Sequence, residues 1–202
     1  MSTEAPRRLR ADAARNSERI VRAARDVFAE QGPDARLDEV ARRAGVGVAT
    51  LYRRFPDKAV LVRAVLDQAF HERVAPVIEE AAQGDDAHAG LVAVLDATMS
   101  LLASEYNTLS AAGDLGVLTM DSRRAFFEQI MGLVRRAQEE GAVRGDLEPE
   151  DVPRFMIMLA SVLVTMERGS EGWKRYLALL GDALSPEAAH PLPPPPPVIR
   201  PF

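Results

Sequence analysis

Apolar residues recur at intervals of three and four along most of the chain, which is the pattern of amphipathic α-helices. Ile20, Ala24, Val27 and Phe28 form the first such stripe, and Gly32-Pro33 ends that helix. The pattern predicts an all-α protein. Its helices are expected at about 17–31, 37–44, 47–55, 58–82, 87–104, 121–140, 150–167 and 171–184, with a short helix and turns at 106–116. Pro76 lies inside the fourth of these helices and should kink it.

The stretch Leu37–Lys58 has the pattern of two short helices joined by a tight turn. Gly45 can adopt the left-handed conformation that ends a helix, and Pro56 stops the second one. Two short helices joined by a Gly-containing turn are the sequence form of a DNA-binding helix-turn-helix. The same shape also occurs in many all-α proteins, so the side chains must decide between the two interpretations.

The second helix of this motif carries side chains of the kinds that bind DNA. Arg53 or Arg54 can read guanine, and Val48 or Ala49 can contact a thymine methyl group. Thr50, Tyr52 and Lys58 can hold phosphates, Lys58 at the start of the next helix. The predicted DNA-binding residues are Gly47, Val48, Ala49, Thr50, Tyr52, Arg53, Arg54 and Lys58.

At these residues the chain resembles the TetR family of transcriptional regulators. The resemblance covers about residues 17–66 and is carried by Ala41, Ala44-Gly45-Val46, Thr50-Leu51-Tyr52, Phe55 and Lys58. Two positions depart from the family pattern. Gly47 replaces the usual capping Ser, and Arg36 stands where Thr or Ser commonly caps a helix, so Asp34 is the candidate for that cap.

The resemblance implies a domain organisation and a function. It places a three-helix DNA-binding domain at 15–60 and a helical-bundle ligand-binding and dimerisation domain at 61–185. The implied protein is a homodimeric repressor that a small effector releases from a palindromic operator. The alternatives are a DNA-binding protein of the same fold with no small-molecule effector, and a helical interaction module or enzyme in which the motif is accidental.

The distribution of charge favours contact with DNA at one end of the chain. The net charge of −5 argues against nucleic acid when it is averaged over all 202 residues. Residues 1–58, however, carry 13 Lys or Arg and 9 Asp or Glu, a net charge of +4, whereas the remainder carries 12 and 21, a net charge of −9. A basic head and an acidic body suit a protein that touches DNA through its head.

The sequence offers no chemistry for catalysis. It has no Cys, and its three His residues fall on different predicted elements without metal-ligand spacing. Neither a phosphate-binding loop nor a nucleophile elbow occurs. We therefore expect no enzyme, no cofactor and no metal. The polar N-terminus and the lack of a long apolar run predict a cytoplasmic protein that makes no contact with a membrane.

The two last predicted helices have more apolar surface than one buried face needs. The helix at 150–167 is apolar nearly all round, and Trp173 begins another apolar stripe. The alternatives are a homodimer interface, which the family resemblance favours, and packing inside one chain. The predicted interface residues are Phe155, Leu159, Val162, Leu163, Met166, Leu177, Leu180 and Leu184.

Large, adaptable side chains in the body indicate an effector pocket, although each alone is more simply ordinary core. Few charges accompany them, which favours a largely apolar or aromatic effector. The predicted pocket residues are Met99, Tyr106, Phe127, Met131, Met156, Met158 and Trp173.

Both ends of the chain are predicted to be disordered. Residues 1–14 are basic, and this arm either stays solvated or reaches the DNA backbone or minor groove. Residues 186–202 are rich in Pro, which excludes helix and strand. The Pro-rich tail is either a ligand for an aromatic groove or a tail without a partner.

Overall fold

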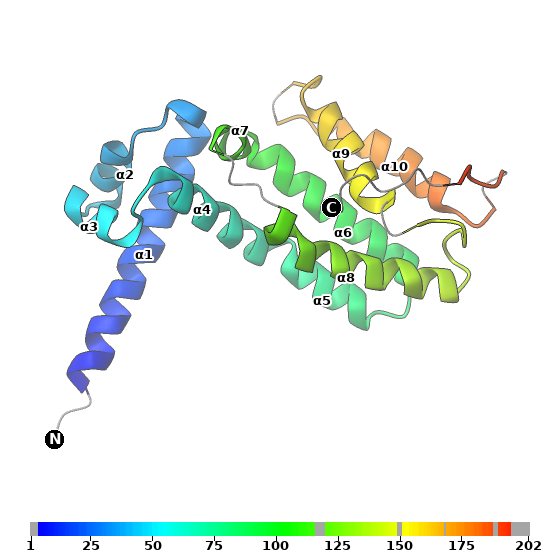
Figure 1. The fold of residues 1–202 in the computed structure, drawn as a ribbon, viewed down its shortest axis with the longest axis horizontal. Helices are drawn as coiled ribbons and strands as arrows, with labels where there is room; N and C mark the ends of the chain where they lie inside the picture. The colour runs from blue at the N-terminus through cyan, green and yellow to red at the C-terminus, as the bar shows by residue number, and fades with distance from the viewer. Residues whose placement is uncertain (1–3, 116–119, 149–150, 168, 188–189, 195–202) are drawn as a thin grey trace. The chain divides into compact units, whose positions relative to one another are not determined.

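The structure, a computed structural model, describes residues 4–115, 120–148, 151–167, 169–187 and 190–194, and only the backbone of residues 4–14 and 120–125. The described residues are helical without strands, so the all-α prediction is confirmed (Figure 1). The helices are α1 (Glu4–Gln31), α2 (Leu37–Ala44), α3 (Val48–Arg54), α4 (Lys58–Arg73), α5 (Ala75–Gln83), α6 (Ala87–Ser104), α7 (Tyr106–Asp114), α8 (Met120–Glu139), α9 (Asp151–Leu163) and α10 (Trp173–Leu184), with a 3-10 turn η1 (Gly32–Asp34).

The chain forms two compact units. The first, called here the head, comprises Met1–Ala69 and Glu105–Leu118, and the second, called here the body, comprises Phe70–Ser104 and Thr119–Phe202. The predicted boundary at residue 60 therefore differs from the division in the structure. The head continues into α4 and also includes α7, which lies far along the chain.

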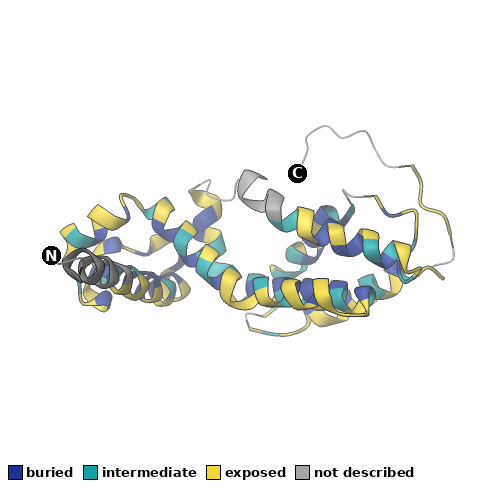
Figure 2. Ribbon diagram, turned by 90° about the horizontal axis from the view of Figure 1, so that it is seen from below, coloured by how far each residue is buried: buried dark blue, intermediate teal, exposed yellow. Residues whose placement is uncertain are grey.

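The core of the head is built on the apolar stripe of α1. Ile20, Ala24, Val27 and Phe28 are buried there together with apolar residues of α2, α3, α4 and α7. Helix α3 contributes Leu51 to this core, and Phe55, the residue after the helix, is buried there as well. The striping of buried and exposed residues along the helices can be followed in Figure 2. The three- and four-residue periodicity thus predicted the buried faces of these helices.

Helix α7 is fastened to α1 by polar contacts as well as by packing. The Glu105 carboxylate, only 3% exposed, accepts a hydrogen bond of 2.7 Å from Arg25 Nε and another of 3.2 Å from Thr108 Oγ1. Asn107 Nδ2 donates to the Ala29 carbonyl over 2.5 Å. A buried carboxylate requires such partners, because an unpaired charge in the interior costs several kcal/mol, on the order of 3–5. Sequence patterns did not predict this contact, because it joins residues about 80 positions apart.

Two predicted elements differ in the structure. The helix expected at 58–82 is broken at Val74 into α4 and α5, and Pro76 lies in the first turn of α5. Proline has no N–H for the carbonyl four residues earlier and its ring crowds that carbonyl, so the break replaces the expected kink. The segment expected to be a short helix with turns is the regular helix α7, with Gly113 inside it.

The structure describes part of each end of the chain, and the disorder expected at residues 1–14 and 186–202 stays a prediction. Residues 4–14 continue α1 without interruption in a stretch rich in Ala and Arg, both good helix formers, with Pro near its start. Residues 190–194 are non-helical but are held to the loop after α8. Arg144 Nη2 donates to the His190 carbonyl over 2.7 Å, and the Leu192 N–H donates to Asp146 over 2.8 Å. Residues 195–202 lie outside the described part of the tail.

In the body, α6 is the central helix and contacts α5, α8, α9 and α10. A Cβ on Gly90 would lie 2.9 Å from the Cβ of Ala81, so glycine permits the close approach of α5 and α6. By length and composition α6 could cross a membrane, with a mean hydropathy of 1.4, contrary to the expectation that no such stretch exists. Its buried Leu91, Val94 and Met99 give it the position of a core helix.

The turn between α2 and α3 has the geometry that its sequence predicts. Gly45 has φ +64° and ends α2, and the N–H of Val46 donates to the Ala41 carbonyl over 3.0 Å. Arg19 Nη2 from α1 donates to the Ala44 carbonyl over 2.5 Å. A Cβ on Gly45 would lie only 2.8 Å from this nitrogen, so both the backbone conformation and the Arg19 contact require glycine.

Replacing Gly45 by Ala should therefore destabilise the protein by about 1–2 kcal/mol, because a left-handed L-residue is strained, with a further loss if Arg19 is displaced. Urea unfolding measures the free energy of unfolding of the variant and of the wild type. Gly132→Ala is the matched control: Gly132 lies inside α8 with nothing within 4 Å of an added Cβ. That control should be more stable by about 0.5–1 kcal/mol. Equal effects of the two changes would contradict the role of the turn.

Candidate nucleic-acid interface

Helix α3 is held by one face and exposed on the other. Leu51 is fully buried in the head, and Gly47 precedes the helix, its carbonyl accepting the N–H groups of Thr50 and Leu51 over 2.8 and 3.1 Å. Gly47 supplies no side-chain cap, which is what the sequence departure predicted. Val48 and Tyr52 are 42% and 44% exposed although both are large and apolar or aromatic. An exposed apolar group on a positioned helix is typical of a contact surface.

The predicted DNA-binding residues do not all lie alike on this surface. Gly47, Val48, Ala49, Tyr52, Arg53 and Arg54 are exposed, whereas Thr50 and Lys58 are half-buried. Arg54 Nε donates to Ser17 Oγ over 2.7 Å, so this arginine ties the end of α3 to α1. Arg53 belongs to the exposed face, and it is the better placed of the two arginines to reach a base.

Lys58 is directed into the head. Its Nζ donates to the Pro33 carbonyl and lies 5.9 Å from the centre of the Phe28 ring. Burial lowers the pKa of Lys58, and the carboxylates of Asp34 and Asp114 oppose that change. In this structure Lys58 therefore joins α4 to η1, and the phosphate contact predicted for it would require the side chain to turn outward.

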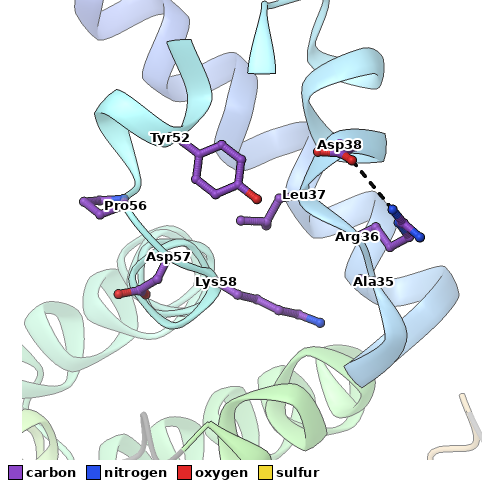
Figure 3. A pocket seen from close by; sticks show the side chains of 8 residues that line it. All are labelled: Ala35, Arg36, Leu37, Asp38, Tyr52, Pro56, Asp57 and Lys58. Atoms are coloured by element: carbon purple, nitrogen blue, oxygen red, sulfur yellow. Dashed lines mark ion pairs between the residues drawn. The ribbon is translucent and has the colours of Figure 1, made fainter. Parts of the chain in front are cut away.

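A hollow of about 440 Å³ opens beside α3, at the N-termini of α2 and α4 (Figure 3). The Tyr52 ring lies over Leu37 on one side, and the Lys58 chain runs along the other. Arg36 and Asp38 form an ion pair of 3.7 Å at its edge. The lining residues are Ala35, Arg36, Leu37, Asp38, Tyr52, Pro56, Asp57 and Lys58.

The two helix N-termini at this hollow differ in how they are capped. Asp57 caps α4, since its Oδ1 accepts the Val60 N–H over 2.8 Å. Helix α2 has Arg36 at its N-cap and no side-chain hydrogen bond there, so the cap expected from Asp34 is wrong. Asp34 lies in η1 instead. The first N–H groups of α2, the Arg36 guanidinium and the Tyr52 hydroxyl together suit a phosphate oxygen. The sequence prediction missed Arg36 because it was considered only as a poor cap.

Two other arginines of the motif are paired with carboxylates. Arg43 contacts both carboxylate oxygens of Glu30, over 2.6 and 2.9 Å, and Arg42 Nε contacts Glu39 over 2.8 Å. These hydrogen bonds lower the pKa of Glu30 and Glu39 below the usual range. The pairs are exposed, so each contributes little to stability.

The predicted dimer interface is partly wrong. Leu159, Leu177 and Leu184 are buried within the chain, because the main stripes of α9 and α10 face the core of the body. The other predicted residues, Phe155, Val162, Leu163, Met166 and Leu180, are half-buried. The exposed apolar face of this helix pair consists instead of Ile157, Met158, Val164, Tyr176 and Leu179, which are 42–65% exposed. We call it the outer face of α9 and α10.

The predicted pocket residues are also divided by the structure. Met99, Met131, Met156 and Trp173 are buried in the body, and Phe127 is half-buried there. Met158 is 62% exposed on the outer face of α9 and α10, so it does not line an interior pocket. Tyr106 belongs to the head. Helical periodicity cannot separate these cases, because each residue lies on a helix with more than one apolar face.

Comparisons with known proteins agree with this geometry. A family model described as "Bacterial regulatory proteins, tetR family" matches residues 20–65, the segment from the core of α1 into α4. An uncharacterized HTH-type transcriptional regulator of Mycobacterium tuberculosis is 33% identical over 144 residues, which are 66% of this chain and 72% of that protein.

Solved structures extend the similarity over most of the chain. The TetR transcription regulatory protein from Mycobacterium vanbaalenii is 31% identical, with a TM-score of 0.62 over 88% of this chain and 99% of that one. FadR from Bacillus subtilis, in complex with stearoyl-CoA, has a TM-score of 0.64 at 16% identity over 86% of this chain and 99% of that one, and it shows the shared fold alone. The chain therefore belongs to the TetR family and is a DNA-binding transcriptional regulator.

Proposed function

We propose that this regulator is a homodimeric repressor that binds a palindromic operator through α3 and is released by a small, largely apolar effector. The observation that carries the DNA-binding part is the exposed face of α3 on a scaffold fixed by Leu51 and Phe55. A recognition helix must be held rigidly from behind while its outer side chains remain accessible, and α3 meets both conditions.

We assign separate roles to the residues of this interface. Val48 and Ala49, at the start of α3, contact base edges in the major groove, and Arg53 reads a guanine. Tyr52, Arg36 and Lys58 hold phosphates around the hollow, with Lys58 turning outward from Pro33, and Thr50 holds a phosphate from α3. Arg54 acts as a positioning residue through its hydrogen bond to Ser17. Gly47 allows the close approach of backbone to DNA.

The outer face of α9 and α10 is the surface that we assign to the homodimer. It gathers large apolar side chains from two neighbouring helices, and these helices contact each other within the body. A two-fold axis through such a pair would produce a four-helix arrangement in which each copy covers the other. Two α3 helices related by that axis would read the two halves of a palindrome.

The effector part of the proposal concerns the body. Four large buried side chains, Met99, Met131, Met156 and Trp173, supply an adaptable apolar interior, and the half-buried Phe127 is next to Phe126, with ring centres 5.3 Å apart. FadR, which has the same fold, binds stearoyl-CoA, so the fold can accommodate a ligand with a long apolar chain. The contacts of Glu105 and Asn107 with α1 make α7 the element of the head through which an effector would act.

The phosphate and base roles predict different responses to mutation. Tyr52→Phe should weaken binding to all duplexes about equally and leave its salt dependence unchanged, because a neutral hydroxyl leaves the phosphate contact and no charge is lost. Arg53→Ala should cost about 1–3 kcal/mol and relax the preference at one base pair. Fluorescence anisotropy measures binding of each protein to a set of single-base operator variants at several salt concentrations. These data give both the base preference and the salt dependence of binding. A loss of preference at a single base pair in Tyr52→Phe would show that the assignment of Tyr52 is wrong.

A charge on the outer face of α9 and α10 should break the dimer. Leu179→Glu places a carboxylate in the proposed interface, so the protein should sediment as a monomer at micromolar concentration and bind the operator at least tenfold more weakly. Ala178→Glu is the control, since Ala178 is exposed on α10 but lies outside this face. The proposal fails if Leu179→Glu remains a dimer with the wild-type dissociation constant.

Effector release requires that effector and operator weaken each other's binding by the same factor. Apolar and aromatic compounds can be screened for displacement of a labelled operator. Calorimetry should then show a lower affinity for an active compound when the operator is bound. An effector that displaces the operator yet binds the free and DNA-bound protein equally would contradict linkage through the body.

A further inference from the structure

Helix α1 continues well past the part of the head that it supports. The most N-terminal core residue with a described side chain is Ile20, whereas the helix begins at Glu4 (Figure 1). The thirteen residues from Glu4 to Asn16 correspond to about 20 Å of helix at 1.5 Å per residue. The core of the head does not account for this extension, which we call the N-terminal extension.

Contacts within the head fix the direction of the N-terminal extension. At the C-terminal end of α1, the Ala29 carbonyl binds Asn107 of α7. Further toward the N-terminus, Arg19 binds the end of α2, and Ser17 binds Arg54 at the end of α3. The extension starts directly after this last contact. It therefore leaves the head beside the recognition helix, at the end of α1 opposite to α7.

The charge of the N-terminal extension suits a polyanion. It carries Arg7, Arg8, Arg10 and Arg15 against Glu4 and Asp12, a net charge of +2. Arg7 and Arg10 are three residues apart in the sequence of this helix. Phosphates flank the major groove on both sides, and a basic helix that starts next to the recognition helix lies within reach of them.

A basic N-terminus can contact either the minor groove or the phosphate backbone of DNA, and the helical structure of the extension favours the backbone. An α-helix with its side chains is about 10–12 Å wide, whereas the minor groove of B-DNA is about 6 Å wide. The extension is helical from Glu4, so it cannot enter that groove as an extended arm does. The N-terminal extension can still contact the phosphate backbone, and such a contact does not depend on base sequence.

Resting on the proposed function, we propose that the N-terminal extension is a second DNA contact, a rigid basic helix that binds backbone phosphates flanking the base pairs read by α3. It would add affinity and salt dependence without adding sequence preference. The partner is duplex DNA beyond the recognised half-site.

The test uses the full chain and a duplex that it selects from a random-sequence library. Binding is measured by fluorescence anisotropy at several salt concentrations, once with a long duplex and once with the same duplex trimmed to the recognised base pairs. Arg7→Ala/Arg10→Ala should weaken binding to the long duplex at least tenfold and reduce its salt slope by about 4, because each of the two copies in the dimer loses two phosphate contacts. The trimmed duplex should bind wild type and variant equally.

Two further variants test separately how the charge and the helical structure of the extension contribute to binding of flanking DNA. Arg63→Ala/Arg135→Ala removes the same charge from exposed positions on α4 and α8 and should leave the difference between the two duplexes unchanged. Ala13→Pro keeps every arginine but breaks the helix, and it should lose the flanking contact as the Arg7/Arg10 variant does. Circular dichroism and thermal unfolding verify that each variant retains the folded head.

Several outcomes would overturn the inference. They are an equal effect of Arg7→Ala/Arg10→Ala on both duplexes, wild-type binding by Ala13→Pro, and a preference for A·T over G·C in the flanks, since this last result would show minor-groove reading by an unfolded arm. Failure of the proposed function has a different signature. In that case the wild-type chain selects no duplex from the library.

Discussion

The apolar stripe of α1 is the constraint on which the head depends. Helix α3 has only seven residues, and isolated helices shorter than about 12–15 residues are marginal in water. Its order comes from Leu51 and Phe55, which are buried in the core cluster that the stripe of α1 shares with α2 and α4, and α3 contacts α2 directly. The orientation of the exposed face of α3 is thus a consequence of packing in that core. A large cavity in this stripe would be expected to disorder the recognition helix before it affected the body.

The same helix carries polar contacts to three other parts of the head. Arg19 holds the turn of the motif, Ser17 holds the end of α3, and Arg25 pairs with the buried Glu105 at the start of α7. The chain passes from the body into the head between Ser104 and Glu105, directly before α7. Breaking a buried pair costs more than its net contribution, because one charge is left uncompensated. The pair therefore holds the start of α7 to α1.

The sequence patterns correctly predicted features that depend on residues close together in the chain. The left-handed Gly45, the end of α3 before Pro56 and the buried face of α1 all follow from residue types at short spacing. The direction of Lys58 toward Pro33 and the tie between Arg54 and Ser17 could not be predicted, because each joins residues far apart in the chain. Pro76 was predicted to kink one long helix, whereas the structure has two separate helices, α4 and α5.

Which apolar face of α9 and α10 is left for a partner could not be predicted, for a related reason. Leu159 and Leu177 mark the strongest apolar stripes, and such stripes fill the core of their own chain first. The face left for a partner is the weaker one, with Met158 and Leu179, and periodicity alone does not rank the two. Apolar surface that is left over once the core is complete is the more informative sign of an interface.

Selection of duplexes from a random-sequence library by the full chain, followed by sequencing, shows whether two copies of α3 bind DNA together. We expect enrichment of an inverted repeat whose half-site centres lie about one DNA turn, ~34 Å, or somewhat more apart, because two α3 helices related by a two-fold axis must enter successive major grooves. Enrichment of a single half-site without symmetry, or no enrichment at low salt, would contradict this expectation.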